Sequence, residues 1–119
     1  MKFICLKYLD RNTWNSFSEG QRRTFLQECL SYDNKLRESG HFFATEAVQA
    51  AGDPVGLHRS CGQLVVEDDL HTRTHELLGG LMFLEARDLN HAIILVSDHP
   101  GVRAGWFKIH PAEDTGVIP

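Results

Sequence analysis

The sequence lacks the features that mark several large classes of protein. No apolar run approaches the roughly 20 residues of a membrane-spanning helix. The apolar start, residues 1–8, contains Lys7 and is followed by no small-residue cleavage site, so no signal peptide is predicted. The formal net charge is −4 and the basic residues are scattered, which argues against a nucleic-acid partner because such proteins carry a basic stripe. There is no glycine-rich phosphate loop or dinucleotide fingerprint, and no organic cofactor is expected.

Cysteine is also scarce. The three residues Cys5, Cys29 and Cys61 are odd in number and lack the spacing of a metal site. Cys5 and Cys29 fall at apolar positions, as small core residues do. This pattern favours a reduced, cytoplasmic protein.

The chain of 119 residues is long enough for one hydrophobic core. We expect a single domain over residues 1–111 and a C-terminal tail over residues 112–119. Residues 2–8 are predicted to form a strand that is apolar on both faces, residues 10–16 a polar connection, and residues 18–39 a helix. Further strands are expected at 41–48, 81–86 and 104–110, a hairpin at 57–60 and 63–67, and a second helix from about 89 to 98.

Local signals set the ends of the two helices. Ser18 with Gln21 forms the pattern of a capping box, and Gly40 is a typical left-handed residue after a helix. Asp88 is a typical N-cap, and Pro100 ends the second helix. The resulting order, strand–helix–strand repeated, predicts an α+β fold: a ferredoxin-like βαββαβ antiparallel sheet with both helices on one face and an inserted hairpin.

Two helices cover only one face of a sheet whose central strands are apolar on both faces. A second copy of the chain is the simplest cover for the other face, so a homodimer is predicted. The alternative is that the hairpin or the tail folds over that face.

Several stretches of the chain resemble the YCII-related family, in the branch named for an Asp-Gly-Pro-Phe motif. The resemblance covers nearly the whole chain. It lies in residues 1–6, 32–41 and 46–49, in Leu78-Gly79-Gly80 followed by residues 84–90, in His99-Pro100, and in residues 105–111. In place of the branch motif this chain has Asp68-Asp69-Leu70-His71, so the aspartate is kept and the rest of the loop differs.

The resemblance implies a dimeric α+β barrel with a cleft on the sheet. It also implies a site that pairs a histidine with an aspartate, and one relative type is a lyase-like dehydrochlorinase acting on a hydroxylated aromatic compound. Some branch members are encoded beside extracytoplasmic-function sigma factors, which implies a regulatory role.

His41 and Asp68 are the predicted catalytic residues. Imidazole titrates near neutrality and can take or give a proton, and a carboxylate can orient it. His41 matches a histidine of the family and Asp68 the motif aspartate. The alternatives are a histidine that contacts carbonyls at the helix end and an aspartate that caps a loop.

His71 and His75 are four residues apart and, with Asp68 or Glu76, would suit a divalent metal ion. The alternative is a solvated polar loop at the mouth of the site.

Tyr8, Trp106 and Lys108 are predicted to line the uncovered face of the sheet and, with His71, to bind a flat anionic or aromatic small molecule. The alternative role for this row is a dimer interface. Two functions stay open: an enzyme that uses acid–base chemistry on a small aromatic compound, and a non-catalytic binding or regulatory module.

Overall fold

The computed structural model describes residues 1–49, 54–68 and 76–114. Its elements, in chain order, are β1 (Lys2–Asp10), α1 (Arg11–Ser16), α2 (Glu19–Glu38), β2 (Phe42–Ala47), β3 (Val55–Ser60), β4 (Gln63–Asp68), β5 (Glu76–Glu85), α3 (Leu89–Ser97), the 3₁₀ turn η1 (Pro100–Arg103) and β6 (Gly105–Pro111). Four strands form an antiparallel sheet in the order β2-β5-β1-β6. This is the order of a ferredoxin-like sheet, so the predicted fold is confirmed.

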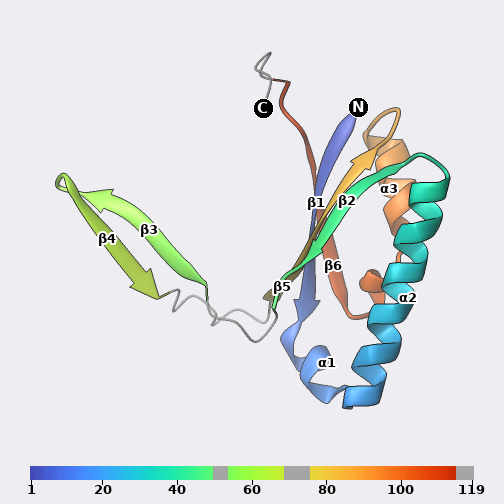
Figure 1. The fold of residues 1–119 in the computed structure, drawn as a ribbon, viewed down its shortest axis with the longest axis horizontal. Helices are drawn as coiled ribbons and strands as arrows, with labels where there is room; N and C mark the ends of the chain where they lie inside the picture. The colour runs from blue at the N-terminus through green and yellow to red at the C-terminus, as the bar shows by residue number, and fades with distance from the viewer. Residues whose placement is uncertain (50–53, 69–75, 115–119) are drawn as a thin grey trace.

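Helices α2 and α3 cover one face of the sheet (Figure 1). The N-terminus of α2 has the predicted capping box: Ser18 accepts a hydrogen bond from the Gln21 amide, and the Gln21 side chain accepts one from the Ser18 amide. Gly40 follows α2 with φ = 82°, a conformation that favours glycine. Asp88 caps α3 by accepting from the His91 amide. These local signals fix both helices against the sheet.

The hydrophobic core lies between these helices and the sheet. Phe3, Cys5 and Leu84 from the two central strands are fully buried. They pack with the apolar sides of α2 and α3, which supply Leu36, Ala92 and Val96. A second cluster fills the other end of the same layer: Leu9, Phe25, Cys29, Leu77 and Ala104, with Trp14 and Phe17 packed against it. The period-2 burial of β1 therefore follows from its alternating side chains.

The opposite face of the sheet is also apolar. We call it the open face and define it by six half-buried residues that point away from the helices: Ile4, Leu6, Tyr8, Leu81, Phe83 and Trp106. The register places Ile4 opposite Phe83 and Tyr8 opposite Trp106. The prediction that the central strands are apolar on both faces is thus confirmed.

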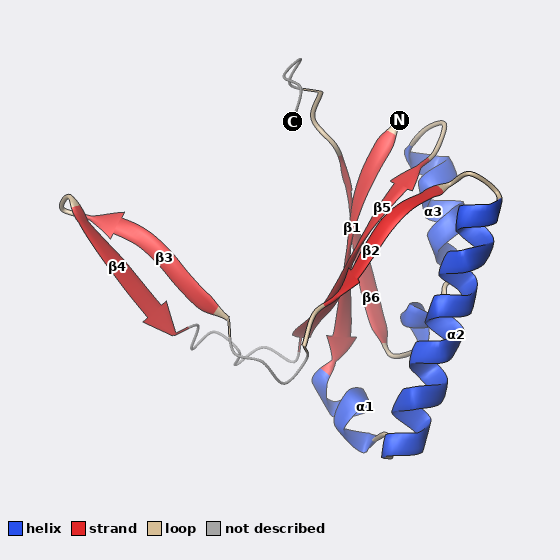
Figure 2. Cartoon of the chain, in the orientation of Figure 1, coloured by secondary structure: helices blue, strands red, loops and turns tan. Residues whose placement is uncertain are grey.

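Strands β3 and β4 form a separate two-stranded sheet that projects away from the body of the molecule (Figure 2). Cys61 (φ = 52°) and Gly62 (φ = 79°) make its turn. Two consecutive residues with positive φ are the pattern of a tight hairpin turn whose twist matches that of the strands. The predicted hairpin is confirmed, and each strand is slightly longer than expected.

The structure differs from expectation at two elements. Residues 10–16 were expected as a polar connection, but residues 11–16 form the helix α1, in which Trp14 packs against the second cluster. Strand β5 begins at Glu76, five residues before the expected start at Leu81. Gly79 has no partner on β1, because Lys7 pairs with Gly80 and Tyr8 with Leu78. A bulge explains why a strand accommodates two consecutive glycines.

Of the described helices, none is long and apolar enough to cross a membrane. The described part of the predicted tail, residues 112–114, begins with an amide of Ala112 that donates to the Lys2 carbonyl. Residues 115–119 lie outside the described residues.

The three thiols differ in accessibility, and this gives a first testable prediction. Burial raises the pKa of Cys5 to about 12 and also raises the pKa of Cys29, whereas Cys61 is exposed at the hairpin turn. Because thiolate is the reactive form, one thiol per chain should react rapidly with Ellman's reagent at pH 8, and three after unfolding in urea. Rapid reaction of two or more thiols in the native protein would contradict the burial of Cys5 and Cys29.

Candidate functional site

A buried histidine–aspartate pair lies between the helices and the sheet. Asp33 comes from α2, and His99 is the residue before η1. The His99 Nε2 atom lies 2.9 Å from Asp33 Oδ1, and the two side chains are 2% and 10% exposed. Asp33 and His99 are 66 residues apart in sequence, and the fold brings their side chains together in the core.

The hydrogen bonds of His99 define its tautomer. Its Nδ1 atom accepts a hydrogen bond of 2.9 Å from the amide of Gly101. Since Nδ1 accepts, the proton of the neutral ring is on Nε2, where it is donated to Asp33. His99 therefore orients the carboxylate and is not itself free to exchange protons with a bound molecule.

Aromatic rings fix the orientation of this imidazole. The centroids of Tyr32 and Phe107 lie 5.2 Å and 4.9 Å from that of His99, in edge-to-face arrangements. The hydroxyl of Tyr32 donates to the Leu95 carbonyl, which holds its ring against α3. A Cβ atom at Gly101 would lie 2.9 Å from Phe107, so glycine is required for this packing. The pair is held rigidly, as a preorganised site requires.

A small cavity of about 10 Å³ lies beside the pair, with room for about one water molecule. Both Asp33 and Lys7 line it, together with Thr45, Gly80, Leu81, Met82, His99 and Phe107. The same two charges act on the nearby thiol of Cys29: desolvation raises its pKa, Lys7 lowers it and Asp33 raises it. The cavity therefore brings a carboxylate and an ammonium group to one small space. A carboxylate can accept a proton there, and the ammonium group can stabilise the anion formed.

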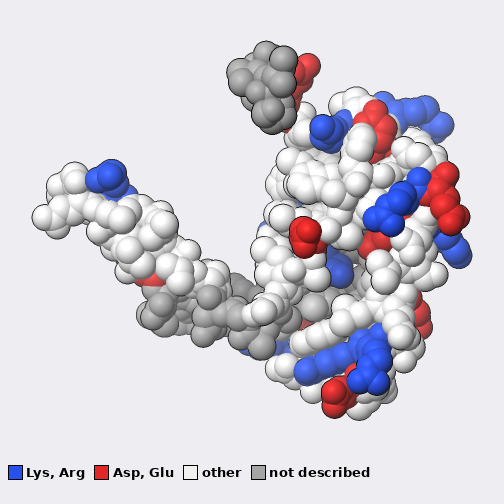
Figure 3. All heavy atoms as spheres, in the orientation of Figure 1, with Lys and Arg blue, Asp and Glu red and all other residues white. Residues whose placement is uncertain are grey.

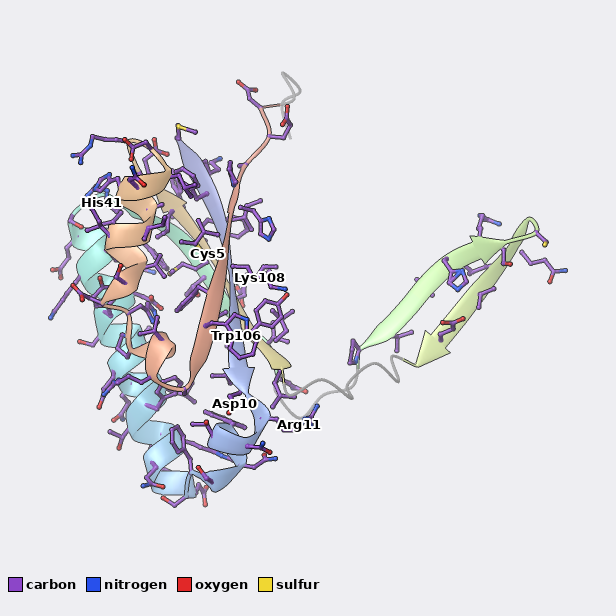
Figure 4. The ribbon with its side chains drawn as sticks, turned by 180° about the vertical axis from the view of Figure 1, so that it is seen from behind. Cys5, Asp10, Arg11, His41, Trp106 and Lys108 are labelled. Carbon is purple, nitrogen blue, oxygen red and sulfur yellow. The ribbon has the colours of Figure 1, made fainter. Side chains whose placement is uncertain are left out.

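His41 lies at the other end of the sheet. Its Nδ1 atom is 3.0 Å from the Glu85 carbonyl oxygen, and its ring is edge-on to His91 with centroids 5.0 Å apart. Desolvation, with the charges of Arg87 and His41, lowers the pKa of His91. Figure 4 shows His41 at the end of the sheet away from Asp10.

Asp68 is the last residue of β4, in the projecting hairpin. Strand β5 follows the hairpin, and its first residue, Glu76, pairs with Asp10. His41 lies near the other end of β5, because the next residue, Phe42, pairs with Leu84. Within one copy the structure does not bring His41 and Asp68 together, and their pairing stays a prediction.

The predicted metal ligands His71 and His75 lie outside the described residues. Among the residues that the structure does describe, no group of three or more histidine, cysteine, aspartate or glutamate side chains could hold a metal ion.

Tyr8, Trp106 and Lys108 do come together on the open face. Figure 4 labels Trp106 and Lys108, which both lie on β6. The rings of Tyr8 and Trp106 are stacked at 6.1 Å with an angle of 17° between their planes. The Lys108 ammonium lies 4.9 Å from the centroid of the Tyr8 ring. The three side chains form a flat aromatic surface with a positive charge beside it, which suits a planar anion.

Asp33 and His99 were not predicted as site residues from the sequence. A signal was present for Asp33, because it lies four residues after Cys29 and three before Leu36, on the apolar stripe of α2. A carboxylate at such a position is rarely buried without a partner. For His99 the sequence offered only its place beside Pro100, at the end of a helix.

Comparison with known proteins assigns the chain to a family. The model of the YCII-related domain matches residues 1–114. None of the curated proteins compared with the chain matches it. Among solved structures, 5-chloro-2-hydroxyhydroquinone dehydrochlorinase (TftG) from Burkholderia phenoliruptrix, in complex with 2,5-dihydroxybenzoquinone, is similar with a TM-score of 0.58 and 11% identity, over 98% of this chain and 97% of that one. This likeness shows a shared fold, and the family match covers almost the entire sequence. The chain belongs to the YCII-related family.

Proposed function

We propose that this protein is an enzyme that carries out acid–base chemistry of the lyase or dehydrochlorinase kind on a small hydroxylated aromatic compound, without an organic cofactor. The observation that carries the proposal is the Asp33 carboxylate, which is oriented by His99 and lines the same cavity as Lys7. The dehydrochlorinase with a similar fold, solved with a dihydroxybenzoquinone, supports the substrate class. We also assign the chain to the Asp-Gly-Pro-Phe branch with an altered motif loop.

The chemistry follows from the three groups. A cavity of about 10 Å³ admits one hydroxyl group of a ring and not the ring itself. Asp33 would accept the proton of that hydroxyl, and the ammonium of Lys7 would stabilise the phenolate. In a chlorinated ring the proton taken up by Asp33 is then returned to the ring carbon that carries chlorine, which gives the keto tautomer with a tetrahedral CHCl carbon. A second ring hydroxyl then loses its proton, its electron pair moves through the ring and chloride leaves, so that a quinone forms and the elements of HCl are lost. His99 acts as a positioning residue by donating to Asp33.

A second function is favoured by a different observation. Both ring nitrogens of His99 are already hydrogen-bonded inside the protein, as in a structural pair. The protein would then bind a planar small molecule on the surface formed by Tyr8, Trp106 and Lys108, without turnover, as part of a regulatory module linked to sigma-factor function.

A rate measurement separates these proposals. We expect the protein to release chloride from 5-chloro-2-hydroxyhydroquinone, and Asp33→Asn to lower kcat by at least about 100-fold, because general-base catalysis contributes on the order of 10²–10⁴. Asparagine keeps the size of the side chain and an oxygen that can accept from His99. Glu38→Gln, at an exposed position of the same helix, is the matched control and should retain the wild-type rate.

His41→Ala tests the alternative catalytic pair. If Asp33→Asn keeps the wild-type rate, whereas His41→Ala and Asp68→Asn each abolish it, the catalytic pair is His41 with Asp68. If the compound binds without chloride release, and Trp106→Ala weakens that binding, the protein is a binding module.

We also propose that the protein is a homodimer. The six apolar residues of the open face are only half-buried in the monomer, and apolar patches of this extent mark interaction surfaces.

A further inference from the structure

The projecting hairpin, β3 with β4, is amphipathic. We call it the arm. Its register places four apolar side chains on one face, and they are 59% to 65% exposed: Val55, Leu57, Leu64 and Val66. Most of the opposite face is polar, and there His58 Nε2 lies 3.2 Å from the Glu67 carboxylate. Figure 3 shows the arm as largely uncharged up to its tip. Arg59 pairs with Leu64 and shares this face near the tip. The four apolar side chains still form an exposed stripe, which is typical of a surface that packs on a partner.

Within one copy, none of the residues that the structure describes covers this side. Residue contacts of the arm are almost all between its own two strands, and the radius of gyration is 16.3 Å, against roughly 13.5 Å for a compact domain of this length. A two-stranded hairpin alone is marginally stable in water. The arm therefore needs a partner surface.

The open face is a second apolar surface that the described residues leave uncovered. The arm leaves the body on the side of the sheet that faces away from α2 and α3 (Figure 1). Each copy thus has an arm with an apolar face and a sheet with an apolar open face, and the arm lies on the side of the sheet that α2 and α3 do not cover. In a closed two-fold dimer each arm can cover the face of the other copy, which leaves neither surface exposed.

We propose that the arm packs its apolar face on the open face of a second copy of this chain. The four arm side chains would bury roughly 150–300 Å² per copy, and the faces beneath them as much again. Two arms then account for on the order of 1,000 Å², the area at which a specific interface begins. Contacts between the two sheets would add to this area.

Cross-linking from the tip of the arm tests the exchange directly. Cys61 is the exposed cysteine and can carry a maleimide-benzophenone, since Cys5 and Cys29 are buried. Unlabelled and ¹⁵N-labelled full-length protein are unfolded, mixed in equal amounts, refolded, irradiated and digested. We expect about half of the cross-linked peptide pairs that contain Cys61 to join a light to a heavy chain. If every cross-linked pair joined light to light or heavy to heavy, the arm would fold onto the body of its own chain. That result would overturn the proposal.

Two matched substitutions test the apolar face. Leu57→Asp should raise the dissociation constant of the dimer at least 100-fold in sedimentation analysis. Ser60→Asp adds the same charge to the same strand, but on the opposite, mostly polar face of the arm, where Ser60 pairs with Gln63. This variant should change the dissociation constant of the dimer less than about threefold. Circular dichroism of each variant monitors the four-stranded sheet, to which the arm does not belong. An unchanged dissociation constant for Leu57→Asp, or equal effects of both variants, would overturn the proposal.

Discussion

His99→Leu should lower the free energy of unfolding by roughly 3–5 kcal/mol, because it leaves the buried Asp33 carboxylate without its hydrogen-bond donor. The same change removes the acceptor of the Gly101 amide, which is buried in η1. An unsatisfied buried group costs about 1–3 kcal/mol. Urea denaturation monitored by circular dichroism measures the loss.

The double variant Asp33→Leu/His99→Leu is the control for this prediction. Replacing both partners with apolar side chains removes the unpaired charge, so the double variant should be more stable than His99→Leu alone. The single variant Asp33→Leu completes the comparison. If the losses of His99→Leu and Asp33→Leu simply added up in the double variant, the two side chains would have no coupling energy, and the hydrogen bond between α2 and the start of η1 would not contribute to stability.

Gly105→Ala should lower the free energy of unfolding by more than about 4 kcal/mol, which for a chain of this size corresponds to a fall in Tm of roughly 15 °C. A Cβ atom at this position would overlap with the Tyr8 carbonyl oxygen and lie 2.8 Å from the Leu9 Cα atom. These are backbone atoms of the paired strand and cannot rotate away. Strands β1 and β6 would have to separate where Leu9 pairs with Gly105.

Gly20→Ala is the matched control, measured by the same thermal unfolding. Gly20 lies in the first turn of α2, where an added Cβ atom would be 4.0 Å from its nearest neighbour. Alanine favours the helix over glycine by up to about 1 kcal/mol, so a small rise in Tm is expected. A Gly105→Ala variant as stable as wild type would mean that β1 and β6 are not packed as described.

The helices and the arm were predictable because their signals are local. The capping box at Ser18 and Gln21 and the cap at Asp88 each lie within three residues of the amides they satisfy. The Cys61-Gly62 turn is likewise a two-residue signal. Helix α1 was missed because it is six residues long and has no side-chain cap. The start of β5 was missed because Gly79 and Gly80 indicate a loop unless the bulge is known.

The candidate site was much less predictable. The sequence put weight on histidines near a polar loop, whereas the structure pairs Asp33 with a histidine 66 residues away. Such a pairing depends on how η1 packs on α2, and no local pattern encodes it. The grouping of Tyr8 with Trp106 and Lys108 was predictable, because strand alternation alone places residues on a common face.

Strand β2 also carries a bulge, and this bulge limits how the sheet can grow by adding further strands. Phe43 is an extra residue between Phe42 and Ala44 on an edge strand of only six residues, and the other edge strand ends at Pro111. Irregular, short or proline-containing edges are poor templates for a further strand. Ribbon-like aggregation by strand addition is therefore disfavoured even though the open face of the sheet is apolar.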